Sequence, residues 1–171
     1  MNPNYFVDQD GKQIDPRIDT MEKHCRYVFK KYVIRRCQAE EIYIIAHSAG
    51  GRCLVDLFKK FRTEFVDNVK AVAFTDSSHK NFQDTFIDKE EENWVKEHCI
   101  HYVKSAKPLG SEVKSTDEGM MPSVSAGHTN HEYTTGSSWE EIQKFFISKA
   151  ESYSLKARGY SCHSEKSYTN E

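Results

Sequence analysis

Short apolar segments alternate with amphipathic segments along most of this chain. The apolar segments cover residues 42–46, 69–74, 99–103 and, less distinctly, 123–125. Such short aliphatic runs are typical of strands that are buried on both faces of a parallel sheet. Residues 52–65 and roughly 88–97 instead repeat their apolar positions at helical spacing. The alternation predicts βαβ units, and therefore an α/β fold with a mostly parallel sheet flanked by helices.

Helix signals also flank this alternating region. Asp15 and Pro16 have the residue types of an N-cap and a first helical position, and apolar residues at helical spacing follow as far as Val33. Ser138 and Glu141 form a capping-box pattern just before another apolar face. We therefore expect one helix before the first strand and one after the last.

Composition adds limits rather than a function. The chain has 171 residues with a formal net charge of -2, so no global charge favours nucleic acid or a membrane surface. No apolar run approaches the ~20 residues that a membrane span needs. Residues 154–171 are rich in Ser, Lys and Tyr without periodicity, so we expect a disordered tail after a single domain over residues 1–153. Direct DNA binding and membrane insertion are not expected.

The first predicted strand ends in the segment Ala46-His47-Ser48-Ala49-Gly50, and a predicted helix follows. A strand, a tight turn with serine at its apex and a helix are the context of a nucleophile elbow. The residues two before and two after the serine must then be small, as Ala46 and Gly50 are. Ser48 is therefore the candidate nucleophile, and the backbone N–H of Ala49 is a candidate oxyanion donor.

A serine nucleophile needs a histidine base and a carboxylate that orients the histidine. Asp76 follows the second predicted strand, and ligands of open α/β sheets bind at the carboxyl ends of strands. The histidine is expected in the loop before the last helix, where residues 127–132 contain both His128 and His131. A capping role for Asp76 in the turn that follows it stays open as an alternative.

Neither a metal nor a cofactor is expected. His128, His131 and Glu132 lack the His-Glu-x-x-His spacing of zinc proteases. Residues 50–52 lack the Gly-Lys-Ser/Thr sequence of a phosphate-binding loop.

Several motifs follow one another in a fixed order: Asn2-Pro3-Asn4, residues 46–51, residues 73–79, Lys107-Pro108-Leu109 and residues 125–132, with Thr134 and Trp139. Their joint order resembles the Arb-type (Argonaute-binding) domain of a family of cotranscriptional regulators, a branch of the α/β-hydrolase superfamily. The resemblance makes His131, rather than His128, the counterpart of the family's histidine. It implies a nuclear or cytoplasmic regulator that acts through protein partners, with Argonaute and chromatin or splicing factors as candidates.

Two departures from that family bear on catalysis. Family members have Pro-Leu-Asp where this chain has Pro108-Leu109-Gly110, so the acid would be Asp76 or Glu112. A complete fold of this type also has strands before the elbow, one of which leads to a second oxyanion donor. Without them, residues 42–46 form an apolar sheet edge. We therefore expect either a piece of a longer protein or a partner that covers the edge.

These observations lead to competing functional hypotheses. The first is a hydrolase-like protein-interaction module with weak or no catalysis. The alternative is a serine esterase or related acyl hydrolase, in which Ser48 attacks, His131 transfers protons, Asp76 orients His131 and the Ala49 N–H holds the oxyanion. RNA binding is a third hypothesis, supported only by the basic segment 30–36. The positive charge of that segment is also what the dipole at the end of a helix favours.

Overall fold

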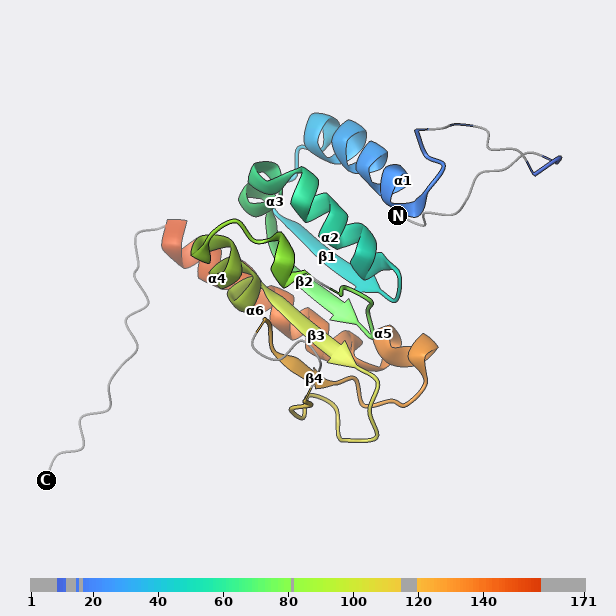
Figure 1. The fold of residues 1–171 in the computed structure, drawn as a ribbon. Helices are drawn as coiled ribbons and strands as arrows, with labels where there is room; N and C mark the ends of the chain where they lie inside the picture. The colour runs from blue at the N-terminus through green and yellow to red at the C-terminus, as the bar shows by residue number, and fades with distance from the viewer. Residues whose placement is uncertain (1–8, 12–14, 16, 81, 115–119, 158–171) are drawn as a thin grey trace, which may run out of the picture.

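The computed structural model describes residues 9–11, 15, 17–80, 82–114 and 120–157. These residues form one four-stranded sheet in the order β1-β2-β3-β4, and each strand is parallel to its neighbour (Figure 1). The strands are Ile42–His47 (β1), Val69–Thr75 (β2), Cys99–Val103 (β3) and Ser123–Ser125 (β4). The predicted strands and the predicted α/β fold with a parallel sheet are therefore confirmed.

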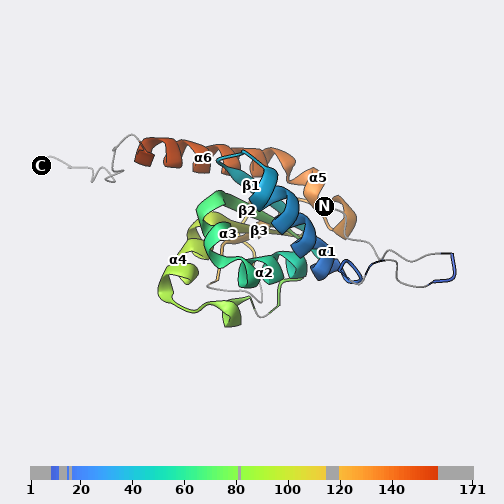
Figure 2. The same cartoon turned by 90° about the horizontal axis from the view of Figure 1, so that it is seen from above.

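Helices lie on both faces of the sheet, as the turned view shows (Figure 2). One layer contains α2 (Gly50–Lys60), α3 (Arg62–Asn68) and α4 (Lys89–His98). The other contains α5 (Thr134–Ser137) and the long α6 (Trp139–Ala157). Short 3₁₀ turns occupy Gln83–Thr85 and His131–Tyr133.

The first helix lies on the β1 side of the molecule and packs against α2 (Figures 1 and 2). It consists of α1 (Met21–Val28), which continues directly into a π-helical segment, Phe29–Ile34. Arg26 of α1 forms an ion pair with Asp56 of α2, at 2.5 Å between Nε and Oδ2. The ion pair adds to the packing of α1 against α2.

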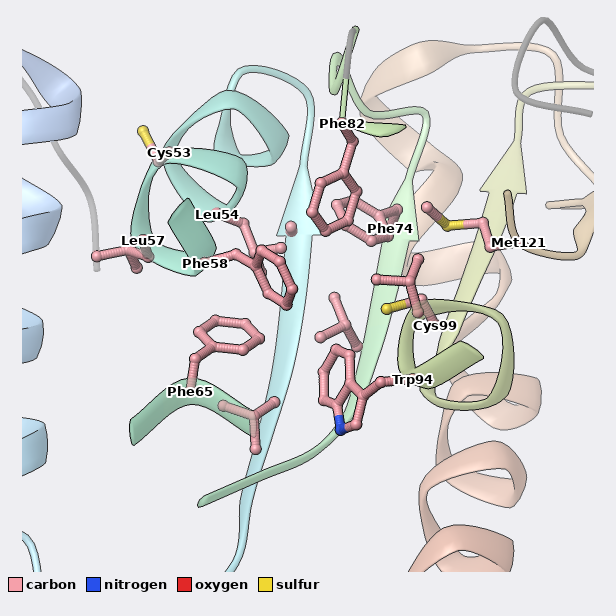
Figure 3. Packing of buried hydrophobic residues seen from close by; sticks show 14 of the residues in the cluster. Cys53, Leu54, Leu57, Phe58, Phe65, Phe74, Phe82, Trp94, Cys99 and Met121 are labelled. Atoms are coloured by element: carbon pink, nitrogen blue, oxygen red, sulfur yellow. The ribbon is translucent and has the colours of Figure 1, made fainter. Parts of the chain in front are cut away.

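The larger core lies between the sheet and the α2–α3–α4 layer (Figure 3). Phe58, Phe65, Phe74 and Phe82 are fully buried in it, and Trp94 is 9% exposed. The Phe58 ring meets the rings of Phe65 and Phe82 edge to face, with centroids 5.5 and 5.2 Å apart. Because each aromatic side chain buries a large apolar area, this cluster stabilises the packing of β2, which contributes Phe74, against the helices.

The first helix begins later than the sequence predicts. Its N-cap is Thr20, whose hydroxyl accepts from the N–H of Lys23, so the prediction of a cap at Asp15 is wrong. Asp15 instead accepts from the backbone N–H of Arg17 and pairs with the Arg17 guanidinium. Both side chains satisfy backbone donors, but only Thr20 stands directly before a continuous helical turn.

Two other helix boundaries also differ from the sequence pattern. The helix predicted over residues 52–65 is interrupted at Phe61, whose φ of -130° and ψ of 46° end α2 and begin α3. The last helix begins at Trp139, where the Ser138 hydroxyl donates back to the carbonyl of Thr134. α6 continues to Ala157, and the rest of the predicted tail, residues 158–171, lies outside the described residues.

Candidate functional site at the ends of β1 and β2

Ser48 follows β1 directly and has a φ of +52°, an unfavourable backbone conformation for a residue with a Cβ. The turn is fixed by its backbone groups. The Ser48 N–H donates to the carbonyl of Thr75 at 3.2 Å. The Ser48 carbonyl accepts from the Ser78 N–H at 2.9 Å and from the Ser77 hydroxyl at 3.3 Å. Hydrogen bonds to the neighbouring strand end therefore hold the strained serine in place.

The small residues of this turn have different roles from those the sequence pattern suggests. Ala46 is buried, as the elbow pattern requires. A Cβ on Gly50 would meet nothing within 4 Å. A Cβ on Gly51 would lie 1.9 Å from the Ser77 hydroxyl oxygen and 2.8 Å from the Ser78 carbonyl oxygen. The close backbone approach that demands glycine is thus at Gly51.

Asp76 takes up the corresponding position at the end of β2, with a φ of +39°. Its N–H donates to the carbonyl of Tyr102 at 2.7 Å. Its carboxylate accepts from His131 Nδ1 at 2.6 Å and lies 3.5 Å from the ammonium nitrogen of Lys104. Burial alone would raise the pKa of Asp76, but the bonds from His131 and Lys104 outweigh it and hold this pKa below its ordinary value of 3.8.

His131 begins the 3₁₀ turn that leads into α5, and it is the histidine that contacts Asp76. Asn130 caps this turn by accepting from the Glu132 N–H. His128 points elsewhere, because its Nδ1 accepts from the Asn130 N–H and its ring packs on Tyr133. Asp76 and His131 are therefore in direct contact, while their catalytic roles stay predictions.

Two further residues complete this arrangement, and sequence reasoning missed one of them, Lys104. The ring centroid of His47 lies 4.6 Å from that of His131, and His47 Nδ1 donates to the Thr75 carbonyl at 3.0 Å. Lys104 follows β3 and reaches Asp76 from the next strand end. Each of these residues lies at or just after the carboxyl end of a parallel strand, which is the signal that would have found them.

The Ser48 hydroxyl itself makes no hydrogen bond within the part of the chain that the structure describes. The backbone N–H of Ala49 follows it as the predicted oxyanion donor. Gly110 has a φ of +78° and donates its N–H to the Ser125 carbonyl, and Glu112 forms an isolated bridge with Val124. It is Asp76, and neither of those loop positions, that carries the carboxylate bound to His131.

An apolar groove of about 470 Å³ lies beside β1 and reaches Ser48. Phe29 and Val33 line it from the first helix, Ile44 from β1, and Leu54 from α2. Within the described ranges, β1 is hydrogen-bonded to β2 alone, so its other edge carries unpaired backbone groups. The site therefore combines a polar centre at the strand ends with an open apolar flank.

No group of three or more His, Cys, Asp or Glu side chains suited to a metal ion occurs among the described residues. None of the helices in the described ranges combines the length and apolarity that a membrane crossing needs.

The model of the Arb2 domain family matches residues 3–109, which is more than half of the chain. The chain belongs to the Arb2 domain family. Among its relatives, the cotranscriptional regulator ARB2A homolog of Xenopus tropicalis is 36% identical over 137 residues, covering 80% of this chain and 32% of the relative. The human cotranscriptional regulator ARB2A is 37% identical over 137 residues, covering 79% and 32%.

A further human relative, described as putative protein ARB2BP, is 33% identical over 128 residues, which is 75% of this chain and 35% of the relative. The chain thus spans about a third of the length of the curated relatives that it matches. No solved structure matches the chain.

Proposed function

We propose that this chain is a protein-interaction module of a cotranscriptional regulator, built on a hydrolase-like fold that has weak or no catalytic activity. The names of its relatives support the regulatory role. The observation that carries the proposal is the open edge of β1 beside the apolar groove. A free strand edge next to an apolar surface is a common docking site for an extended peptide segment.

The chemistry of this flank favours a protein segment over a lipid or another apolar ligand. An acyl chain would cover the unpaired N–H and C=O groups of β1 without forming hydrogen bonds, and burial of such groups is costly. A strand from a partner would pair with these groups and also place alternate side chains on Ile44 and Leu54, which line the groove. Argonaute and chromatin or splicing factors are the proposed partners, and the nucleus is the proposed site of action.

Weak catalysis is supported by the state of the serine. Ser48 Oγ has no hydrogen bond to His131 within the described residues, and the backbone N–H of Ala49 is the one oxyanion donor that the elbow itself supplies. Loss of one oxyanion donor typically lowers turnover by ~10²–10³. A site with this deficit serves better as a surface for binding than as an efficient hydrolase.

The test is binding of purified Argonaute to this chain and to a matched pair of charge variants. Ile44→Asp introduces a charge on the groove, whereas Ile147→Asp introduces it on α6, where Ile147 is 58% exposed. We expect Ile44→Asp to abolish binding while Ile147→Asp and Ser48→Ala retain it. Circular dichroism must show that each variant is folded. Equal binding by the folded groove variant would refute the proposed contact surface.

A serine acyl hydrolase is the second candidate, and the contact between His131 and Asp76 favours it. With its Nδ1 proton donated to Asp76, the imidazole of His131 keeps Nε2 free to accept the Ser48 proton. Ser48 Oγ would then attack an acyl carbonyl, His131 would pass the proton to the leaving group, and the Ala49 N–H would bind the oxyanion. Water would release the acyl group by the same route.

Covalent labelling by a fluorophosphonate probe tests this second candidate. Labelling that is present in the wild type, absent in Ser48→Ala and reduced in Asp76→Asn would establish an activated serine. A folded, monodisperse wild type that takes up no label would eliminate the hydrolase and leave the interaction module.

A further inference from the structure

The outer side of the first helix carries a cluster of cations around a shallow hollow. The hollow measures about 250 Å³ and is lined by Arg17, Tyr27, Lys30, Lys31 and Arg35. This side is distinct from the one that faces the groove, where Phe29 and Val33 contribute. The same helix therefore presents an apolar side to β1 and a basic side to solvent.

Most of these cations have no carboxylate partner. Arg17 pairs with Asp15 at 2.6 Å, but Lys30, Lys31 and Arg35 form no ion pair within the described part of the chain. The overall net charge of -2 does not reveal this cluster, because it averages over the whole chain while Lys30, Lys31 and Arg35 lie together. The fold thus gathers cations on one side of the first helix, although positive and negative residues nearly balance over the whole sequence.

Tyrosine rings fix the positions of the cations. The Lys31 ammonium donates to the Tyr27 hydroxyl at 2.6 Å and lies 5.0 Å from the centre of the Tyr27 ring. Arg17 lies 5.5 Å from the same ring. Arg36 lies 5.4 Å from the ring of Tyr32. Cation–π contacts of this kind reduce the freedom that flexible basic side chains would lose on binding an anion.

The dipole of the first helix does not account for the cluster. Basic residues near the end of a helix are favoured by its dipole, which suits Lys31 and Arg35. Arg17, however, precedes the first turn of α1 and still reaches the same hollow. In addition, the π-helical segment from Phe29 to Ile34 widens the turn, and such segments are frequent at functional sites.

We propose that this basic side of the first helix binds single-stranded RNA. The cations would contact successive phosphates, and Tyr32, which is 45% exposed, would offer an aromatic surface to a base. A pairing of basic and aromatic side chains fits a single strand better than it fits an acidic peptide, which has no bases to stack. The surface is separate from the groove proposed for protein partners.

The experiment is a fluorescence anisotropy titration of the full chain with a labelled oligouridine of about 12 nucleotides, at about 50 and 200 mM KCl. The test variant is Lys30→Gln/Lys31→Gln/Arg35→Gln. The control is Lys59→Gln/Lys60→Gln/Lys114→Gln, which removes three exposed cations from other surfaces. Because both variants lose three positive charges, the control has the same net charge as the test variant. Ile44→Asp is included to separate this surface from the groove.

The wild type is expected to bind at low salt and to weaken as salt rises. The test variant should bind at least about tenfold more weakly than the wild type. The slope of the logarithm of its binding constant against the logarithm of the salt concentration should be smaller in magnitude by about 2, as loss of three phosphate contacts implies. The control and Ile44→Asp should stay within about twofold of the wild type. Absence of wild-type binding at low salt would overturn the proposal, as would an equal loss in the control.

A competition experiment with an acidic peptide tests whether the surface binds an acidic protein instead of RNA. A polyglutamate of equal charge that displaces the RNA as well as unlabelled oligouridine does would assign the surface to an acidic protein and overturn the proposal for RNA. Failure of polyglutamate to compete, together with weaker binding by Tyr32→Ala, would support recognition of both phosphate and base.

Discussion

β1 and β2 are neighbouring apolar strands that end in the same unusual way. Each is followed directly by a non-glycine residue at positive φ, Ser48 after β1 and Asp76 after β2. The Asp76 carboxylate is bound by His131 and Lys104, whereas the Ser48 hydroxyl has no hydrogen bond among the described residues. Among the strands that the structure describes, β2 is paired on both edges and β1 on one.

The difference shows which of the two strand ends has its side chain bound by neighbouring side chains. A strained backbone persists only where the surrounding structure holds it. At Asp76 the side chain is part of what holds it, so this residue belongs to the framework of the site. At Ser48, the hydrogen bonds formed among the described residues reach the backbone alone.

The largest expected effect comes from removing one apolar side chain from each of these two strands, β1 and β2. Phe74 of β2 is fully buried, so Phe74→Ala should lower the free energy of unfolding by about 3–5 kcal/mol. Ile44 of β1 is only half-buried, so Ile44→Ala should cost about 1–2 kcal/mol. Urea unfolding followed by circular dichroism measures both. Equal losses would mean that β1 is as enclosed as β2.

The turn after β1 gives a sharper test with adjacent glycines. Gly51→Ala forces a Cβ against the Ser78 carbonyl and should destabilise the fold by about 1–3 kcal/mol. Gly50→Ala has open space and should leave stability unchanged or raise it by up to about 1 kcal/mol, because alanine favours the helix. If Gly50→Ala proved the more damaging change, the close approach would lie at the other glycine.

The end of β2 should depend on pH. Asp76→Asn is expected to lower the free energy of unfolding by about 1–2 kcal/mol near pH 7, because the charged bonds to His131 and Lys104 are lost. Since the pKa of Asp76 in the folded chain lies below 3.8, its stabilisation is complete above that pH and disappears as the pH falls through the lowered value. Urea unfolding at pH 7 and pH 3 tests this. A gap between variant and wild type that failed to narrow in acid would assign the loss to another cause.

The smallest expected effect is at the end of β1. Ser48→Gly relieves the positive φ and should stabilise the chain by up to about 1 kcal/mol. The same substitution at a residue whose side chain held the fold would be destabilising. A drop in melting temperature for Ser48→Gly would therefore show that the hydroxyl makes a contact needed for stability.

Much of the fold could be predicted from the sequence, because strands that are buried on both faces of a sheet have continuous apolar segments. The aliphatic runs of β1, β2 and β3 predicted the strands, and the alternation with helices predicted their parallel order. Helix ends were less predictable, since they depend on tertiary contacts. Phe61 ends α2 where its ring packs 5.5 Å from that of Phe29, a residue distant in sequence.

The candidate site was predictable to the same extent. The position of Asp76 after a strand and of His131 before the last helix reflects topology, which a sequence pattern records. The roles of Lys104 and Gly51 were not predictable, because each depends on which loop lies above it in space. The basic segment 30–36 was visible in the sequence, but Arg17 joins it around Tyr27 only in the folded chain.

The clamp on the Ser48 carbonyl has a mechanical consequence. Ser77 and Ser78 both donate to that oxygen, and they directly follow Asp76. These two hydrogen bonds therefore connect the turn after β1 directly to the turn after β2. A displacement of either turn would strain these two hydrogen bonds, and the carboxylate that binds His131 lies next to them in the chain.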